Sequence, residues 1–128
     1  MQRPIITSSL DAYSAIAHLL LEREDENFII ILLSNNNKII KIVPISNGGV
    51  NETIVDRRLI FKTALENNAV KIILAHNHPS GDTKPSQADI STTKTIIEAG
   101  RIMSIQVIDH IIIGNDDNYY SFLDHGII

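Results

Sequence analysis

An uninterrupted apolar segment leads directly into two histidines, and this junction constrains the fold more than any other feature of the sequence. Residues 72–75 read Ile-Ile-Leu-Ala, and His76 and His78 follow with one residue between them. Because alternate side chains of an extended segment point to the same face, both imidazoles are expected on one side of a strand end. Pro79 disfavours helical backbone at His78 and keeps that residue extended. The segment 70–75 is apolar on both faces, as expected of a central strand.

A loop and the start of a helix follow the two histidines. Residues 79–84 contain Pro, Ser, Gly and Asp, which is typical of a loop that reverses the chain. Ser86 is then suited to cap a helix, and Asp89 falls at the third helical position. A carboxylate in that first turn would return toward the strand end that carries His76 and His78.

These three side chains suit a catalytic metal site. Imidazole binds zinc well among the first-row metals. Two neutral histidines and one aspartate leave the fourth tetrahedral position to water, which is the arrangement of a catalytic rather than a structural zinc site. We therefore predict that His76, His78 and Asp89 bind Zn2+. The alternative is an incidental His-x-His pair and an aspartate that only caps the helix. His110 is expected to be a hydrogen-bonded structural histidine rather than a fourth ligand, and Asn77 to satisfy backbone groups of the loop.

Hydrolysis at such a site also needs a base that takes a proton from the zinc-bound water, whose pKa the metal lowers toward ~7. A carboxylate that lies near the metal without binding it would serve. Glu26 stands just before the apolar segment 28–33, which could lie beside the segment 70–75. Spacing alone does not separate Glu26 from Glu24 or Asp25. A solvated carboxylate at a strand entry is the alternative role for Glu26.

The remaining sequence predicts a mixed α/β domain. Hydrophobic periodicity and turn residues give the element order α-β-β-α-β-α-β-β. Segments 28–33 and 38–45 are expected to form an antiparallel hairpin around the asparagine-rich turn at 35–37. The helix that begins after Ser86 is expected to end near residue 99, with Gly100 as its C′ residue. With 128 residues and no repeats or linkers, we expect a single domain over the whole chain.

Composition and charge exclude several classes of function. The chain has no cysteine, which excludes disulfides, thiolate metal sites and the zinc deaminases that use a Pro-Cys-x-x-Cys pattern. The net charge is −4 and the basic residues are scattered, which argues against direct nucleic-acid binding because that binding relies on clustered positive charge. The longest apolar run, residues 28–33, is far shorter than the ~20 residues that span a bilayer. We expect a cytoplasmic protein that does not associate with membranes.

The order of these residues resembles a known signature. A glutamate followed by His-x-His-x7-Ser-x2-Asp resembles the JAMM motif of the JAB/MPN metalloproteases. Residues 76–89 read H-N-H-P-S-G-D-T-K-P-S-Q-A-D, and together with Glu98-Ala99-Gly100 and Asp109-His110 they resemble the bacterial RadC family in particular. Residues 119–122, Tyr-Tyr-Ser-Phe, are similar to the C-terminal strand of that family. The resemblance covers the chain from about residue 10 to its end.

The resemblance implies both a fold and a set of roles. The fold would be the JAB/MPN architecture, which is like that of cytidine deaminases, with a mixed, mostly antiparallel sheet flanked by helices. Zinc would be bound by His76, His78 and Asp89. Glu26 would be the base, and Ser86 would hydrogen-bond the zinc-bound water or the oxyanion. Many RadC proteins also carry an N-terminal helix-hairpin-helix-like region, and we expect this chain to be a short form without it.

Two functions follow from the resemblance. The first is a zinc-dependent hydrolase of peptide or isopeptide bonds, a JAMM-type metallopeptidase that acts on a peptide or protein substrate. The alternative is a non-catalytic, metal-binding RadC-like accessory protein of DNA repair. The sequence leaves the identity of the substrate and the oligomeric state open.

Overall fold

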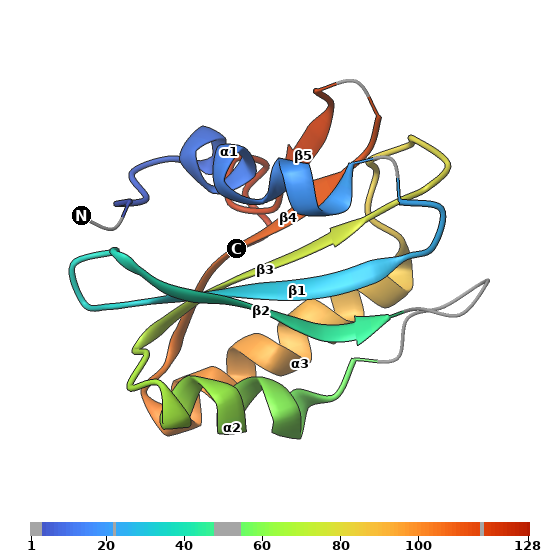
Figure 1. The fold of residues 1–128 in the computed structure, drawn as a ribbon. Coiled ribbons are helices and arrows are strands. Elements are labelled where there is room, and N and C mark those ends of the chain that lie inside the picture. Colours follow the sequence, from blue (N-terminus) through green and yellow to red (C-terminus); the bar gives the residue numbers. More distant parts are fainter. Residues whose placement is uncertain (1–3, 22, 48–54, 116) are drawn as a thin grey trace.

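One mixed sheet organises the chain in the computed structural model, which describes residues 4–21, 23–47, 55–115 and 117–128. The five strands lie in the order β2-β1-β3-β4-β5, and each neighbouring pair is antiparallel except β3 with β4. The helix α1 covers one face of the sheet, and α2 and α3 cover the other (Figure 1). The predicted fold class and element order are therefore confirmed. The elements are α1 (Ser9–Leu20), β1 (Asn27–Leu33), β2 (Ile39–Asn47), α2 (Arg57–Glu66), β3 (Lys71–Asn77), α3 (Gln87–Met103), β4 (Gln106–Ile113) and β5 (Tyr119–Ser121).

The strand β3 lies at the centre of this sheet, between antiparallel β1 and parallel β4. Every residue of β3 after the first is buried, as the apolar run on both faces predicts. Ile73 and Ala75 pack in the core under α1, whereas Ile72 and Leu74 pack in the core under α2 and α3. His76 continues the second of these series. Its imidazole therefore lies on the face of the sheet that α3 covers.

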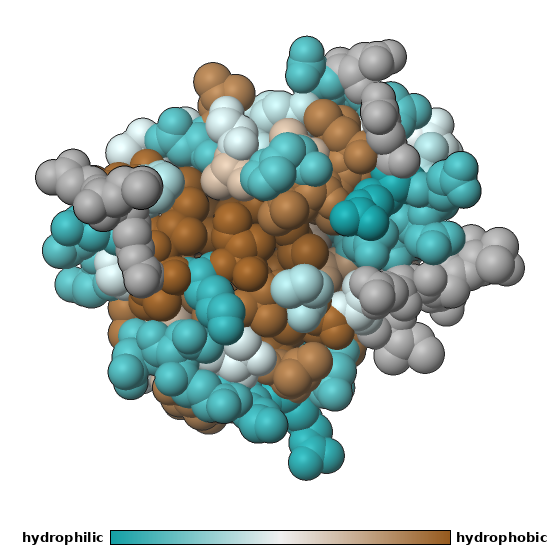
Figure 2. Space-filling view, viewed as in Figure 1, coloured by the Kyte–Doolittle hydropathy of each residue, from teal (hydrophilic) through white to brown (hydrophobic). Residues whose placement is uncertain are grey.

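Two mostly aliphatic cores, one on each face of the sheet, pack the helices against the strands. Ile16 and Leu20 of α1 are fully buried on one face, and Ile60 of α2 and Ile96 of α3 are fully buried on the other. Burying a side chain of this size stabilises the fold by about 1.5–3 kcal/mol. On the face that Figure 2 shows, apolar side chains gather between α1 and the sheet, and polar side chains surround them. In the described part of the chain, each helix is too short or too polar to cross a membrane.

The hairpin agrees with the prediction, but the end of α3 does not. β1 and β2 pair antiparallel around a turn at which Asn37 has a φ of 63°. The prediction that α3 ends near residue 99 with Gly100 at C′ is wrong, because the helix continues to Met103 and ends at Ser104, whose φ is 59°. Gly100 serves a close approach instead, since a Cβ there would lie 2.3 Å from the carbonyl oxygen of Ile105. The chain folds back directly onto the last turn.

Candidate metal centre

Two imidazoles converge where β3 ends. His76 lies within the strand, and His78 follows directly after it. Their Nε2 atoms are 3.0 Å apart. The backbone N–H of His78 donates to the carbonyl of Ile113 at 2.8 Å, which keeps His78 alongside β4. The side chain of His76 is 2% exposed and that of His78 is 17% exposed, so the first imidazole is buried and the second is partly accessible to solvent.

The first turn of α3 brings Asp89 to the same place. Ser86 caps the helix by accepting the N–H of Asp89 at 3.0 Å, and Asp89 Oδ2 accepts the N–H of Ser86 at 2.9 Å. The same carboxylate lies 3.1 Å from His78 Nε2 through Oδ2 and 3.3 Å from His76 Nε2 through Oδ1. The carboxylate of Asp89 therefore caps the helix and faces both imidazoles at the same time. The capping box holds the carboxylate in position for both.

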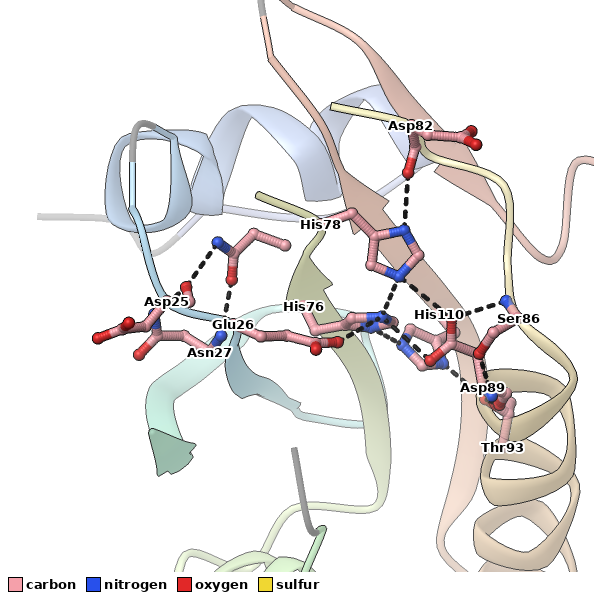
Figure 3. Close-up of polar contacts among 11 residues, drawn as sticks. Asp25, Glu26, Asn27, His76, His78, Asp82, Ser86, Asp89, Thr93 and His110 are labelled. Carbon is pink, nitrogen blue, oxygen red and sulfur yellow. Dashed lines mark hydrogen bonds and ion pairs between the residues drawn. The ribbon is translucent and has the colours of Figure 1, made fainter. Parts of the chain in front are cut away.

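Glu26 reaches the two histidines from the start of β1. Its Oε1 lies 3.6 Å from His76 Nε2, and its side chain is 21% exposed. The register of β1 on β3 places Phe28 opposite His76, which brings the preceding residues to the same end of the sheet. The sequence left Glu24 and Asp25 as alternatives, and the structure brings the carboxylate of Glu26 rather than either of these into the group (Figure 3).

The backbone on both sides of Glu26 is held by Asn77. The side-chain Oδ1 of Asn77 accepts the N–H of Asn27 at 2.7 Å, and its Nδ2 donates to the carbonyl of Asp25 at 2.9 Å. Asn77 is 2% exposed, so water competes little for these bonds. Asn77 thus satisfies backbone groups as predicted, but these groups lie beside Glu26 rather than in the loop after the histidines.

Four of these side chains form a group that could hold a metal ion, since one ligand atom from each lies within 4.8 Å of the others: Glu26, His76, His78 and Asp89. Zinc bonds of about 2.05 Å in a tetrahedron place ligand atoms about 3.3 Å apart. The separations of 3.0, 3.3 and 3.1 Å among the imidazoles and Asp89 are close to that spacing. His78 Nδ1 must donate to the carbonyl of Asp82, 2.7 Å away, because a carbonyl only accepts. The Nε2 of neutral His78 therefore presents a lone pair to the group, as metal binding requires.

Charges within the group shift the pKa of its members. The hydrogen bond with Asp89 raises the pKa of His78 above its usual value of 6.5, although burial opposes this. Burial would raise the pKa of Asp89, but the adjacent imidazoles of His76 and His78 outweigh burial and hold that pKa well below the usual 3.8. Asp89 therefore stays ionised at neutral pH, and a metal ion must displace a proton from His78 in mildly acidic solution.

A second layer of polar side chains lies behind His76. His110 Nε2 is 2.7 Å from His76 Nδ1, and His110 Nδ1 is 2.6 Å from Thr93 Oγ1. The ring of His110 stacks on Phe122 with a centroid distance of 4.6 Å, and burial lowers its pKa. This agrees with the predicted structural, hydrogen-bonded histidine. Thr93 was not predicted from the sequence, although its spacing of four residues from Asp89 places both on one face of α3.

The comparisons with known proteins agree with this geometry. The family model described as RadC-like JAB domain matches residues 6–127. The chain is 48% identical over 122 residues to a UPF0758 protein of Flavobacterium johnsoniae, and the matched segment covers 95% of this chain and 53% of that protein. It is 42% identical over 127 residues to a UPF0758 protein of Porphyromonas gingivalis, and this match covers 99% of this chain and 56% of that protein. The chain spans about half the length of these curated relatives, whose names state no activity. On this match, the chain belongs to the family of RadC-like JAB domains.

Proposed function

We propose that this chain is a zinc-dependent hydrolase of peptide or isopeptide bonds, with a peptide or protein as its substrate. The observation that carries the proposal is the convergence of His76, His78 and Asp89 at nearly tetrahedral separations, with the carboxylate of Glu26 at their side. His76, His78 and Asp89 would hold the ion. Zinc, when bound there, would supply a Lewis acid that lowers the pKa of a coordinated water and polarises a carbonyl group.

Glu26 is the proposed base of the reaction. Its carboxylate is farther from His76 Nε2 than that of Asp89, 3.6 Å against 3.3 Å, and it is also the more exposed of the two. This position suits a group that takes the proton of the attacking water and gives it to the leaving amine. The two bonds from Asn77 to the neighbouring backbone support the proposal, because a base works best when its position is held by surrounding contacts.

Ser86 is the proposed donor to the oxyanion. Its Oγ accepts the N–H of Asp89, so the hydroxyl proton remains available to donate to a substrate oxygen. Ser86 is exposed at the first turn of α3, where the positive end of the helix dipole also favours developing negative charge. One residue would then both cap the helix and stabilise the tetrahedral intermediate.

Zinc content and hydrolysis together test this proposal. We expect the wild type to hold zinc, and a variant with both His76→Ala and Asp89→Ala to lose it. Against a panel of peptide and isopeptide substrates, Glu26→Gln should keep its zinc and lose activity by about 10²–10⁴-fold, the usual contribution of general base catalysis. Full zinc retention in the double variant would contradict the metal site.

A different pair of results would favour the accessory role in DNA repair. Zinc binding without hydrolysis of any substrate in the panel would speak against the enzyme. A salt-dependent affinity for DNA that survives removal of zinc would then support the alternative, since phosphate contacts make DNA binding sensitive to salt.

A further inference from the structure

Three hydrogen bonds run in series from a backbone carbonyl of α3 to the ring of His76 (Figure 3). The direction of each bond follows from the carbonyl at which the series begins, that of Asp89. The carbonyl of Asp89 only accepts, so Thr93 Oγ1 uses its single proton there, at 2.7 Å. Thr93 Oγ1 must then accept the Nδ1–H of His110 at 2.6 Å. A neutral His110 has no second ring proton, so its Nε2 accepts the Nδ1–H of His76 at 2.7 Å. His76 Nε2 is left with a lone pair, which faces His78 and Asp89.

These hydrogen bonds form a relay from Asp89 through Thr93 and His110 to His76, and burial keeps the ring of His110 neutral by lowering its pKa. Thr93 and His110 are each 1% exposed, and burying a charged imidazolium is costly. The ring of His76 stacks on Phe28 at a centroid distance of 5.9 Å, and that of His110 stacks on Phe122. These contacts restrict rotation of both imidazoles. The hydrogen bonds that remain available to them are therefore those of the relay.

We propose that Thr93 and His110 are positioning residues that hold His76 in its Nδ1–H tautomer, so that its Nε2 lone pair faces the metal site before an ion arrives. The ring N–H of a metal-bound histidine is usually held by a carboxylate or a backbone carbonyl. Here a second, buried histidine does this, and its own partner hydroxyl ends on the backbone of Asp89. The positions of two proposed ligands are thereby linked through the protein. The inference rests on the proposed metal site.

The tautomer can be measured directly in the metal-free wild type. Nitrogen-15 NMR of the ring nitrogens at pH 8 should place the proton on Nδ1 of both His76 and His110. A proton on Nε2 of His76 would mean that this nitrogen donates to Asp89 instead of presenting a lone pair, and this would overturn the proposal. The measurement needs no bound zinc, so its outcome is independent of whether the proposed function is correct.

Substitution of Thr93 tests the effect on metal binding. Thr93→Val keeps the shape of the side chain and removes the hydroxyl, so zinc affinity measured by chelator competition should fall about 10–100-fold, as for other lost supporting contacts. Thr93→Ser should restore it. The matched control is Thr95→Val on the same helix, because Thr95 is exposed and its Oγ1 donates to Ser91 at 3.0 Å in the same four-residue pattern.

The outcomes distinguish the positioning role of Thr93 and His110 from the proposed zinc-dependent function. Equal zinc affinity in Thr93→Val and Thr95→Val would overturn the positioning role. Thermal unfolding of both valine variants controls for lost stability, and the NMR measurement on the wild type decides if Thr93→Val does not fold. A wild type that binds no zinc would contradict the proposed function, and the observed tautomer would then decide the positioning role alone.

Discussion

Replacing Asp89 by asparagine should separate its proposed role as a ligand from its role as a helix cap. In the capping box, Asp89 Oδ2 accepts the N–H of Ser86 at 2.9 Å. The amide oxygen of asparagine can accept the same bond, so the metal-free stability of Asp89→Asn should stay close to that of the wild type and above that of Asp89→Ala. Asp89→Ala loses the bond, and a lost cap contact of this kind costs about 0.5–2 kcal/mol.

Zinc should stabilise the wild type much more than Asp89→Asn. At a free zinc concentration of about 100 times Kd, binding adds about 2.7 kcal/mol to the free energy of unfolding. With about 2.1 cal/mol/K of unfolding entropy per residue over 128 residues, this corresponds to a rise in Tm of about 10 °C. A neutral amide binds zinc poorly. Even a loss of about 100-fold in affinity leaves only about 0.4 kcal/mol at the same zinc concentration, or a rise of about 1–2 °C.

Thermal unfolding with and without zinc measures both effects in one experiment. It should be run at alkaline pH, where the proton on His78 competes less with the metal. The proposed role of Asp89 as a ligand is refuted if Asp89→Asn retains the full zinc-dependent rise in Tm, because Asp89 would then be a cap alone. The separation of the two roles fails if the metal-free asparagine variant unfolds as early as Asp89→Ala, because the cap would then require the negative charge.

Three further predictions concern stability and pH. Gly100→Ala should lower the free energy of unfolding by about 1–3 kcal/mol, because the alanine Cβ would lie 2.3 Å from the carbonyl oxygen of Ile105. The clash outweighs the helix propensity of alanine, which favours the variant by about 1 kcal/mol. Urea titration showing equal or greater stability would contradict the clash. Burial raises the pKa of Asp109, so its contribution to stability is greatest below about pH 4 and declines as the pH rises through the raised pKa. Asp109→Asn should therefore gain stability relative to the wild type between about pH 4 and pH 7, and urea titrations showing a constant difference would refute this. Because the bond with Asp89 raises the pKa of His78, zinc affinity should fall by about tenfold per pH unit below that pKa; calorimetry that finds no such dependence would exclude His78 as a ligand.

Much of the site could be predicted because its parts are local in sequence. The alternation of an extended strand places His76 and His78 on one face, whatever the rest of the chain does. Helix geometry places Asp89 three residues after the Ser86 cap, which both orients the carboxylate and starts α3. The apolar run before the histidines likewise predicts a central strand, because only a strand covered on both faces buries every side chain.

Only the tertiary structure decided which distant residues complete the group. Glu26 is distinguished from Glu24 and Asp25 by the register of β1 on β3, and register depends on packing across the whole sheet rather than on spacing in sequence. Likewise, Thr93 contacts His110 only because α3 packs on the face of β4 that carries that ring. Short-range geometry therefore determined the proposed ligands, whereas packing between distant elements determined the proposed base and the partners that orient His76.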